Sequence, residues 1–214
     1  HDMREPIRVI ESYLSLVTER FATGLGANGL RYMDTAAAAA GRMRTLLEAL
    51  LAYAHVGNGA LVPQPLSLRA VASAAVKNLS AAIQAADAAV AITGDDCAIS
   101  GDGALLTQLL QNLIGNAIKF HRPGVQPRVD IVWRHQEDGC LCSVSDNGIG
   151  IAQADQERIF EIFQRLNSVS QYPGSGIGLA TCRRIVDRHH GRIWVESREG
   201  HGSTFLVLIP SQPG

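Results

Sequence analysis

The chain has 214 residues, enough for one large domain or two small ones. Hydrophobic residues make up 46% and charged residues 18%, which provides material for a core and excludes a disordered protein. The formal net charge of −1 argues against a nucleic-acid-binding protein, because such proteins carry an excess of basic residues to contact phosphates.

Two further features bear on location. No apolar run approaches the roughly 20 residues that span a bilayer, and the N-terminal residues HDMREPIR contain no apolar segment of a signal peptide. We therefore expect no membrane contact and a cytoplasmic location. No C-x-x-C pair occurs among the four cysteines, which are Cys97, Cys140, Cys142 and Cys182. We expect buried reduced thiols in place of a metal site, in a reducing compartment.

The N-terminal part of the chain is predicted to form two helices. Apolar residues recur every three or four positions from Ile7 to Phe21, and again from Leu30 to Ala54. The glycine-containing segment 23–29 separates these stripes and predicts a turn, which gives an antiparallel helical hairpin. A lone hairpin cannot bury both of its faces, so we expect two copies to pair as a four-helix bundle. The sequence thus predicts a homodimer.

Two stretches rich in glycine or proline indicate a domain boundary. They are Gly57-Asn58-Gly59 and Pro63-Gln64-Pro65. We assign residues 1–60 to the hairpin and residues 66–214 to a second domain with a mixed pattern. There we expect helices at 67–86, at 102–120 and from about 174 to 190, and strands at 90–93, 97–100, 129–134, 141–145, 192–197 and 204–209. The predicted fold class is α+β, a helical hairpin followed by an α/β sandwich whose mixed sheet packs on helices.

The predicted helix 102–120 has a polar face. Asn112, Asn116 and Lys119 share that face because they lie three or four positions apart. An amide oxygen suits Mg²⁺, and a lysine supplies positive charge for a phosphate. Lysine is scarce in this chain, where it occurs only at Lys77 and Lys119, so its presence here calls for a reason. Taken alone, the pattern fits a solvated helix face equally well.

Two glycine-containing turns follow. In Asp146-Asn147-Gly148-Ile149-Gly150, which comes directly after a strand, a carboxylate can accept from an exocyclic amine and the glycines let a planar ring approach. Gly174-Ser175-Gly176-Ile177-Gly178-Leu179 opens a helix, where free backbone N–H groups can bind an anion. The spacing does not match the dinucleotide-binding fingerprint, and the absence of G-K-[ST] excludes a P-loop. Alone, the first stretch is an ordinary turn and the second is a weak signal.

In this order, the three features resemble the ATP-binding domain shared by sensor histidine kinases and gyrase/Hsp90-type ATPases, over residues 66–214. The asparagine helix is similar to the N box of that family. The other boxes are matched by Asp146–Gly150, Phe160–Phe163 and Gly174–Gly178. The kinase branch fits better, because the gyrase/Hsp90 branch carries a water-activating glutamate where this chain has Asn112, which cannot act as a base.

The resemblance implies a role for each residue. It implies that Asn116 ligates Mg²⁺ with help from Asn112, that Lys119 lies near the phosphates of ATP, and that Asp146 accepts the adenine amino group. The remaining residues that it assigns to ATP binding are Gly148, Gly150, Arg165, Gly174, Gly176, Gly178 and Leu179. A solvated charge at a helix end is the alternative for Arg165. ATP is the implied substrate and Mg²⁺ the implied metal.

The first residues, His1-Asp2-Met3-Arg4-Glu5-Pro6, resemble the H box of histidine kinases, particularly of the phytochrome-like group. Neutral imidazole is a good nitrogen nucleophile near neutral pH, and an adjacent carboxylate can orient the ring and take up its proton. The resemblance implies that His1 is the phosphoacceptor and that Asp2 assists it. Glu5 stands where the family commonly has Thr or Asn, so we expect weak or absent phosphatase activity. Because the chain begins on His1, we expect a fragment of a larger receptor.

These observations together predict the core of a sensor histidine kinase. In this hypothesis ATP–Mg²⁺ phosphorylates His1, and the phosphoryl group passes to an aspartate of a response regulator docked against the hairpin, in two-component signal transduction. Two alternatives remain open. One is a non-catalytic scaffold that binds ATP and dimerises through its hairpin, and the other is a gyrase-type ATPase, which Asn112 disfavours.

Overall fold

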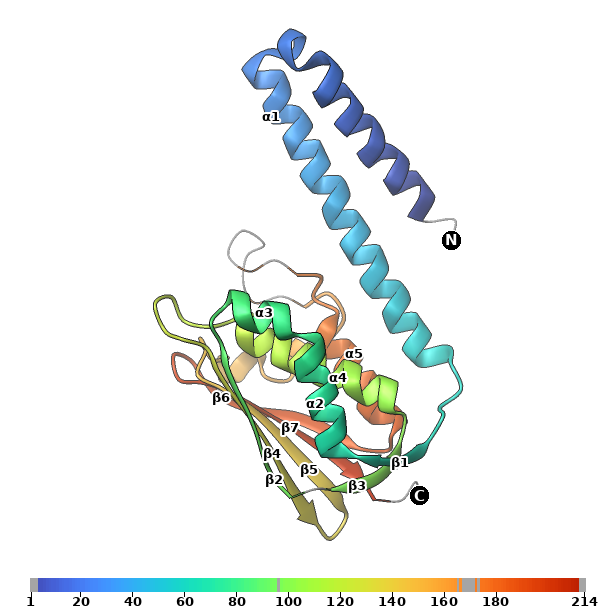
Figure 1. The fold of residues 1–214 in the computed structure, drawn as a ribbon, viewed down its shortest axis with the longest axis vertical. Coiled ribbons are helices and arrows are strands. Elements are labelled where there is room, and N and C mark those ends of the chain that lie inside the picture. Colours follow the sequence, from blue (N-terminus) through green and yellow to red (C-terminus); the bar gives the residue numbers. More distant parts are fainter. Residues whose placement is uncertain (1–3, 96, 165, 167–171, 173, 212–214) are drawn as a thin grey trace. The chain divides into compact units, whose positions relative to one another are not determined.

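The computed structural model describes the chain except for residues 1–3, 96, 165, 167–171, 173 and 212–214 (Figure 1). The chain divides into two compact units, His1–Ala54 and His55–Gly214. This division falls just before the Gly57-Asn58-Gly59 stretch, where the sequence places a boundary. Among the described residues, no helix combines the length and the hydrophobicity needed to cross a lipid bilayer.

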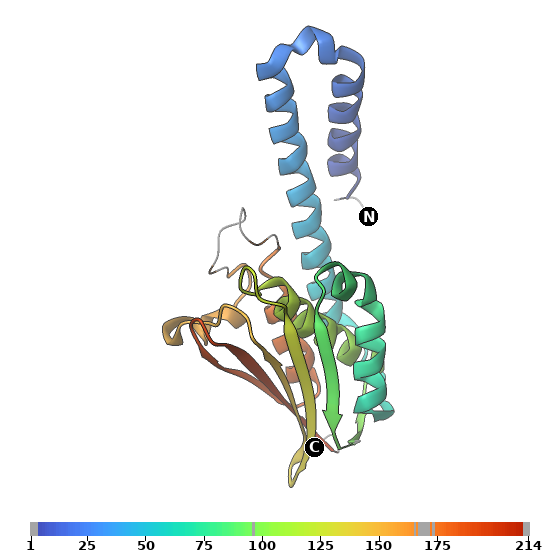
Figure 2. The ribbon, with the colours of Figure 1, turned by 60° about the vertical axis from the view of Figure 1, so that its left-hand side comes forward.

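The first unit is a helical hairpin formed within α1 (Arg4–Asn58). The helix reverses direction at Gly26, whose φ of 60° and ψ of 176° are not helical. A left-handed φ of this kind favours glycine, because any Cβ would be strained there. Both figures of the ribbon show the two arms side by side (Figure 1, Figure 2). The predicted reversal within 23–29 is therefore present, but as a kink at one glycine in place of a loop.

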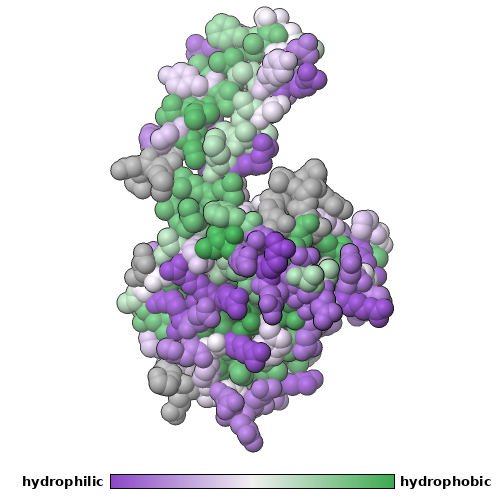
Figure 3. All heavy atoms as spheres, turned by 180° about the vertical axis from the view of Figure 1, so that it is seen from behind, coloured by the Kyte–Doolittle hydropathy of each residue, from purple (hydrophilic) through white to green (hydrophobic). Residues whose placement is uncertain are grey.

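The two arms of the hairpin contact each other through few buried side chains. Arg44 Nε lies 3.3 Å from Glu11 Oε1 on the opposite arm, and Ala40 is almost completely buried. Many large apolar side chains of the hairpin nevertheless remain exposed, namely Val9, Ile10, Tyr13, Leu16, Phe21, Tyr32, Met43, Leu46 and Leu50. Apolar patches are visible over this unit in Figure 3. A single hairpin thus leaves much of its apolar stripe in water.

The second unit is built on a five-stranded mixed sheet with the order β2-β4-β5-β7-β6. Its strands are β2 (Ala89–Gly94), β4 (Arg128–Gln136), β5 (Gly139–Asp146), β6 (Arg192–Arg198) and β7 (Gly202–Pro210). The β2–β4 pair is parallel, and the other neighbours are antiparallel. Burial alternates along the strands, so that Val129, Ile131 and Trp133 of β4 are buried on one face of the sheet.

Helices cover that buried face of the sheet (Figure 2). They are α2 (Leu68–Asn78), α4 (Gly103–Lys119) and α5 (Gly178–Arg188), with the short α3 (Ser80–Ala85) after α2. Single turns of 3₁₀-helix, η1 (Gln153–Asp155) and η2 (Arg158–Phe160), lie between β5 and α5. Leu110, Leu113 and Ile114 of α4 are fully buried in the core between the two layers. The predicted α+β class, with a mixed sheet packed on helices, is confirmed.

Two segments of the second unit differ from the sequence prediction. The expected helix 67–86 is interrupted at Leu79, whose φ of −95° and ψ of 7° end α2 before α3 begins. The proline-containing stretch, expected to be a linker, contains β1 (Gln64–Ser67), which pairs antiparallel with β3 (Ala98–Gly101). Pro65 fits there because each strand of a two-stranded ribbon keeps one free edge, where a missing N–H donor does no harm.

Candidate functional site

A cavity of about 300 Å³ lies in the second unit, at the end of β5 and beside α4 and α5. This volume is in the range of small-molecule binding sites. Three stretches that are far apart in the sequence meet there. The predicted site residues that line the cavity are Asn112, Asn116, Lys119, Asp146, Gly150, Gly174, Gly176, Gly178 and Leu179.

Four predicted site residues are not among those lining residues. Gly148 lies beside the cavity, where a Cβ would be 2.4 Å from the Phe120 carbonyl oxygen, so the backbone packs too closely for any side chain. Its N–H donates to Asp146 Oδ1 at 2.8 Å. Gly148 therefore shapes the turn that holds Asp146. The other three, His1, Asp2 and Arg165, lie outside the described residues.

The polar face of α4 is directed at the cavity. Asp102 caps the helix, because its Oδ1 accepts from the N–H groups of Ala104 and Leu105 at 3.0 and 3.1 Å. Asn112, Asn116 and Lys119 are half-buried on one side of the helix. The residues between them that are buried in the core are Leu113, Ile114, Ala117 and Ile118. The helical period predicted from the sequence thus separates core residues from cavity residues correctly.

Asn112 links α4 to the start of α5. Its Nδ2 donates to the carbonyl of Gly178 at 3.4 Å. A Cβ on Gly178 would lie 3.9 Å from the Asn112 side chain, which shows how close the two helices come at this point. The helix α5 begins at Gly178, about four residues later than the sequence predicts, so residues 174–177 form a non-helical loop that leads into it.

Lys119 approaches this glycine-containing segment from the other end of the polar face. A Cβ on Gly174 would lie only 2.6 Å from Lys119 Nζ. The same Nζ lies 4.3 Å from the centre of the Phe120 ring, a favourable cation–π distance. Gly176 has a φ of 72°, which a residue with a Cβ adopts only with strain. A positive charge and glycine backbone therefore lie together in the cavity wall.

Asp146 ends β5 with its carboxylate in the cavity wall. Its Oδ1 accepts two backbone hydrogen bonds, from Gly148 at 2.8 Å and from Ser203 at 3.2 Å. Burial raises the pKa of Asp146 above its ordinary value, although both hydrogen bonds act in the opposite direction. The two hydrogen bonds therefore offset only part of the cost of burying the ionised carboxylate. A ligand that donates a hydrogen bond to it would stabilise its charge.

The apolar part of the cavity wall was not predicted from the sequence. The rings of Phe120 and Tyr172 lie 5.1 Å apart, and the Tyr172 hydroxyl donates to the His121 carbonyl at 3.3 Å. Other apolar wall residues are Ile149, Ile151, Ile159, Leu166 and Phe205. Phe120 could have been noticed, because it follows Lys119 directly. Tyr172 carries no such signal, because the stretch around it has no periodicity.

The cavity thus combines flat apolar side chains and a buried carboxylate with a lysine, two side-chain amides and several glycines. Apolar side chains with a few placed polar groups are typical of small-molecule sites. The flat rings of Phe120 and Tyr172 suit a planar group. The lysine and the exposed glycine backbone suit an anionic group. A ligand that joins a hydrogen-bond-donating ring to an anionic tail fits both sets of residues.

Comparisons with known proteins agree with this geometry. The family model described as histidine kinase-, DNA gyrase B- and HSP90-like ATPase matches residues 101–213. The chain is 39% identical to Cyanobacterial phytochrome A of Nostoc sp. and 37% identical to Phytochrome-like protein Cph1 of Synechocystis sp.. Each match covers 98% of this chain, but 27% and 28% of the respective relative. The chain therefore spans little more than a quarter of the length of these relatives.

Solved structures share the fold. Full-length ShkA in complex with AMPPNP superimposes with a TM-score of 0.74 at 24% identity, over 100% of this chain and 45% of that one. Histidine kinase ThkA in complex with response regulator protein TrrA gives a TM-score of 0.69 at 22% identity, over 99% of this chain and 60% of that one. At these identities the likeness concerns the fold alone.

Proposed function

We propose that this chain, which belongs to the histidine kinase-, DNA gyrase B- and HSP90-like ATPase family, is the catalytic core of a sensor histidine kinase. The observation that carries the proposal is the convergence of Asn116, Lys119, Asp146 and Gly174 on one cavity. These four residues come from the three stretches that were predicted from the sequence, with Asn116 and Lys119 both on α4. The likeness to phytochrome-type relatives along almost the whole chain supports the kinase branch of the family.

In this proposal the cavity binds ATP. Asp146 accepts a hydrogen bond from the adenine amino group, and apolar residues such as Ile149 and Ile151 contact the ring. Lys119 and the backbone around Gly174 and Gly176 bind the phosphates. The AMPPNP in the structure of ShkA is an ATP analogue, which supports a nucleotide in this fold.

The side chains of Asn116 and Asn112 fit a Mg²⁺ ion that accompanies the nucleotide. Both are half-buried in the cavity wall and offer amide oxygens, which are hard ligands of the kind that Mg²⁺ accepts. Mg²⁺ usually takes only one or two ligands from the protein and the rest from phosphates and water. When bound, it would neutralise charge on the phosphates.

The acceptor of the phosphoryl group in this proposal is His1. A ring nitrogen of His1 forms a bond to the γ-phosphorus of ATP, the bond from that phosphorus to the leaving oxygen of ADP breaks, and Asp2 takes up the ring proton. The phosphoryl group then passes to an aspartate of a response regulator. The complex of ThkA with a response regulator supports a partner of this kind for the fold.

The hairpin is proposed to form a homodimer. Its exposed apolar side chains, among them Ile10, Phe21 and Leu50, have no cover within the described part of the chain. Pairing with a second hairpin would bury them in a four-helix bundle. The surface of this bundle would also offer a docking site for the response regulator.

Nucleotide binding tests the assignment of the cavity. We expect Lys119→Ala to weaken ATP binding by about 10- to 100-fold, the usual effect of losing a charged hydrogen-bonding partner. Lys77 is the matched control, because it is the other lysine of the chain and is exposed on α2, outside the cavity wall. Equal ATP affinities for Lys119→Ala, Lys77→Ala and the unaltered protein, measured with a fluorescent ATP analogue, would contradict the assignment.

A further inference from the structure

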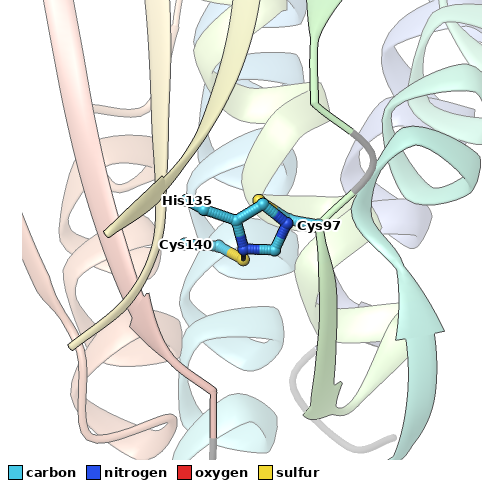
Figure 4. A group of neighbouring side chains, drawn as sticks. All are labelled: Cys97, His135 and Cys140. Carbon is cyan, nitrogen blue, oxygen red and sulfur yellow. Dashed lines mark hydrogen bonds between the residues drawn. The ribbon is translucent and has the colours of Figure 1, made fainter. Parts of the chain in front are cut away.

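A second group of ligating side chains lies elsewhere in the second unit. Cys97 precedes β3, His135 is near the end of β4, and Cys140 is near the start of β5. Their two sulfur atoms and one ring nitrogen all lie within 4.8 Å of one another, and the three side chains point toward one another (Figure 4). Cys140 precedes Asp146 by six residues along β5, which corresponds to roughly 20 Å, so this group is separate from the nucleotide cavity.

His135 occupies a position where the strand pattern calls for an apolar residue. The core-facing positions of β4 are Val129, Ile131 and Trp133, and the alternation places His135 next on that face. His135 is also the direct cross-strand partner of Cys140. The ring Nδ1 lies 4.0 Å from Cys140 Sγ, while the rest of the side chain remains exposed. An exposed imidazole ring thus lies next to two buried thiols.

The two thiols are fully buried and free. Burial, the hydrogen bond to Cys97 and the charge of Cys97, in that order, raise the pKa of the Cys140 thiol to about 12. A protonated, buried thiol is a poor nucleophile, so Cys140 is not suited to be the attacking thiol of a redox sensor. A bound cation, by contrast, supplies the positive charge that a thiolate needs and displaces its proton.

We propose that Cys97, His135 and Cys140 bind one Zn²⁺ ion. Two thiolates and one imidazole are ligands that zinc prefers, and a water on the exposed side of His135 completes the tetrahedron. Each S–H bond is replaced by an S–Zn bond, the two protons leave to solvent, and the imidazole gives a nitrogen lone pair. The two thiolates balance the charge of the ion, and the step needs no oxidant or reductant.

The three ligand atoms must move slightly closer together to bind one zinc ion. Zinc–ligand bonds of about 2.0–2.3 Å place two ligand atoms of a tetrahedron at most about 3.8 Å apart. The present separations, up to 4.8 Å, exceed this by about 1 Å. Rotation of the exposed His135 side chain supplies part of that movement. The bound ion would fasten the β1–β3 ribbon to the β4–β5 hairpin, and it replaces the uncoordinated thiols that the cysteine spacing alone had suggested.

Zinc titration of the purified, reduced, metal-free protein tests this proposal, with a chromophoric chelator as competitor. We expect one equivalent of Zn²⁺ to bind. His135→Gln should lower the zinc affinity by at least about 10-fold. Losing a residue that only hydrogen-bonds to a metal ligand already lowers metal affinity by about 10- to 100-fold, and His135 is itself a proposed ligand. His201→Gln is the matched control, because His201 is exposed and lies outside the group. The substitution at exposed His135 should leave the fold and ATP binding intact.

A Co²⁺ titration identifies the sulfur ligands. The unaltered protein and Cys182→Ser, which removes a buried thiol outside the group, should show thiolate-to-cobalt absorption. The absorption should be lost or strongly weakened in Cys140→Ser. The proposal is overturned if the folded protein binds no stoichiometric Zn²⁺, if His135→Gln binds Zn²⁺ as tightly as His201→Gln, or if bound Co²⁺ shows no thiolate absorption. A Cys97–Cys140 disulfide, found by mass spectrometry of the protein purified without reductant, would also overturn it.

Discussion

The backbone N–H of Ser203 donates a hydrogen bond to Asp146 Oδ1 across 3.2 Å, which joins the beginning of β7 to the end of β5 at the cavity. Gly148 donates to the same oxygen from within the turn. These two bonds fix the orientation of the Asp146 side chain. They do not fully offset the cost of burying its charge, because burial still raises its pKa.

Asp146→Asn should weaken the binding of ATP more than the binding of GTP. Guanine has a carbonyl oxygen where adenine has an amino group, so a carboxylate selects adenine and an amide need not. We expect the affinity for ATP to fall by about 10- to 100-fold, the effect of losing a hydrogen bond to a charged group, and that for GTP to fall much less. Competition of both nucleotides against a labelled ATP analogue measures this. A comparable loss for both would place Asp146 outside the base-binding part of the cavity.

The same substitution should change the pH dependence of stability. The pKa of Asp146 in the folded protein lies above its ordinary value of 3.8. Between these two pKa values the folded state holds more protons than the unfolded state, so the free energy of unfolding falls as pH rises through this window. Asn keeps an oxygen for both backbone donors and carries no charge.

We therefore expect Asp146→Asn to be at least as stable as the unaltered protein in nucleotide-free buffer near neutral pH. Its advantage should shrink as the pH falls toward that of the unperturbed carboxyl group. Urea unfolding of the variant and of the unaltered protein, at neutral and at acidic pH, measures the free energies of unfolding to be compared. A variant that is markedly less stable at neutral pH would show that the ionised carboxylate stabilises the fold.

Asn116→Ala should act mainly on the contribution of Mg²⁺ to nucleotide binding. The substitution removes one amide oxygen from the cavity wall and buries no new group, so the fold should persist. We expect ATP affinity to respond to added Mg²⁺ much less than in the unaltered protein. Asn78→Ala is the control, because Asn78 is exposed at the end of α2. Equal responses to Mg²⁺ in the two variants would remove Asn116 from the proposed metal site.

His189 makes a pH-dependent contribution to stability. It is buried at the end of α5, where its Nε2 accepts from the backbone N–H of Asp102 at 3.0 Å and its Nδ1 lies 2.8 Å from the Ile185 carbonyl oxygen. Burial lowers the pKa of His189 below 6.5. Below that pH the unfolded state binds the proton more readily than the folded state, so stability falls as the pH drops from about 6.5 through the pKa of the folded protein.

His189→Gln should remove this pH dependence. The variant should be less stable by about 1–3 kcal/mol near neutral pH, because buried partners lose hydrogen bonds. It should then lose less further stability on acidification than the unaltered protein. Denaturant unfolding at several pH values, with exposed His201→Gln as control, provides the comparison. Parallel curves for His189→Gln and the unaltered protein would exclude His189 as the titrating group.

The sequence predicted the parts of the fold that depend on local periodicity. The polar face of Asn112, Asn116 and Lys119 followed from the helical repeat, and the β4–β5 hairpin followed from alternation around a turn. The β1 strand was missed because Pro65 reads as a breaker, and only its pairing with β3 makes it a strand. The end of α2 at Leu79 was missed because the apolar stripe continues through it.

Side chains brought together by tertiary structure could not be found in this way. The ring of Tyr172 lies next to the ring of Phe120. Its hydroxyl donates to the carbonyl of His121, which is 51 positions earlier in the sequence. The Cys97, His135 and Cys140 group joins three separate strands or their ends, and only the register of β4 with β5 pairs two of its members. Sequence spacing therefore finds ligands that share one element, but not those that meet across elements.

Labelling of His1 by γ-labelled ATP tests the kinase proposal most directly. The protein, extended by one helical turn before His1 so that this residue is not terminal, is incubated with the nucleotide and Mg²⁺. The proposal predicts a phosphoramidate, which is lost in acid and survives alkali, and its absence in His1→Gln, which should still bind ATP. A protein that binds ATP tightly but acquires no acid-labile phosphate would contradict the kinase and favour an ATP-binding scaffold.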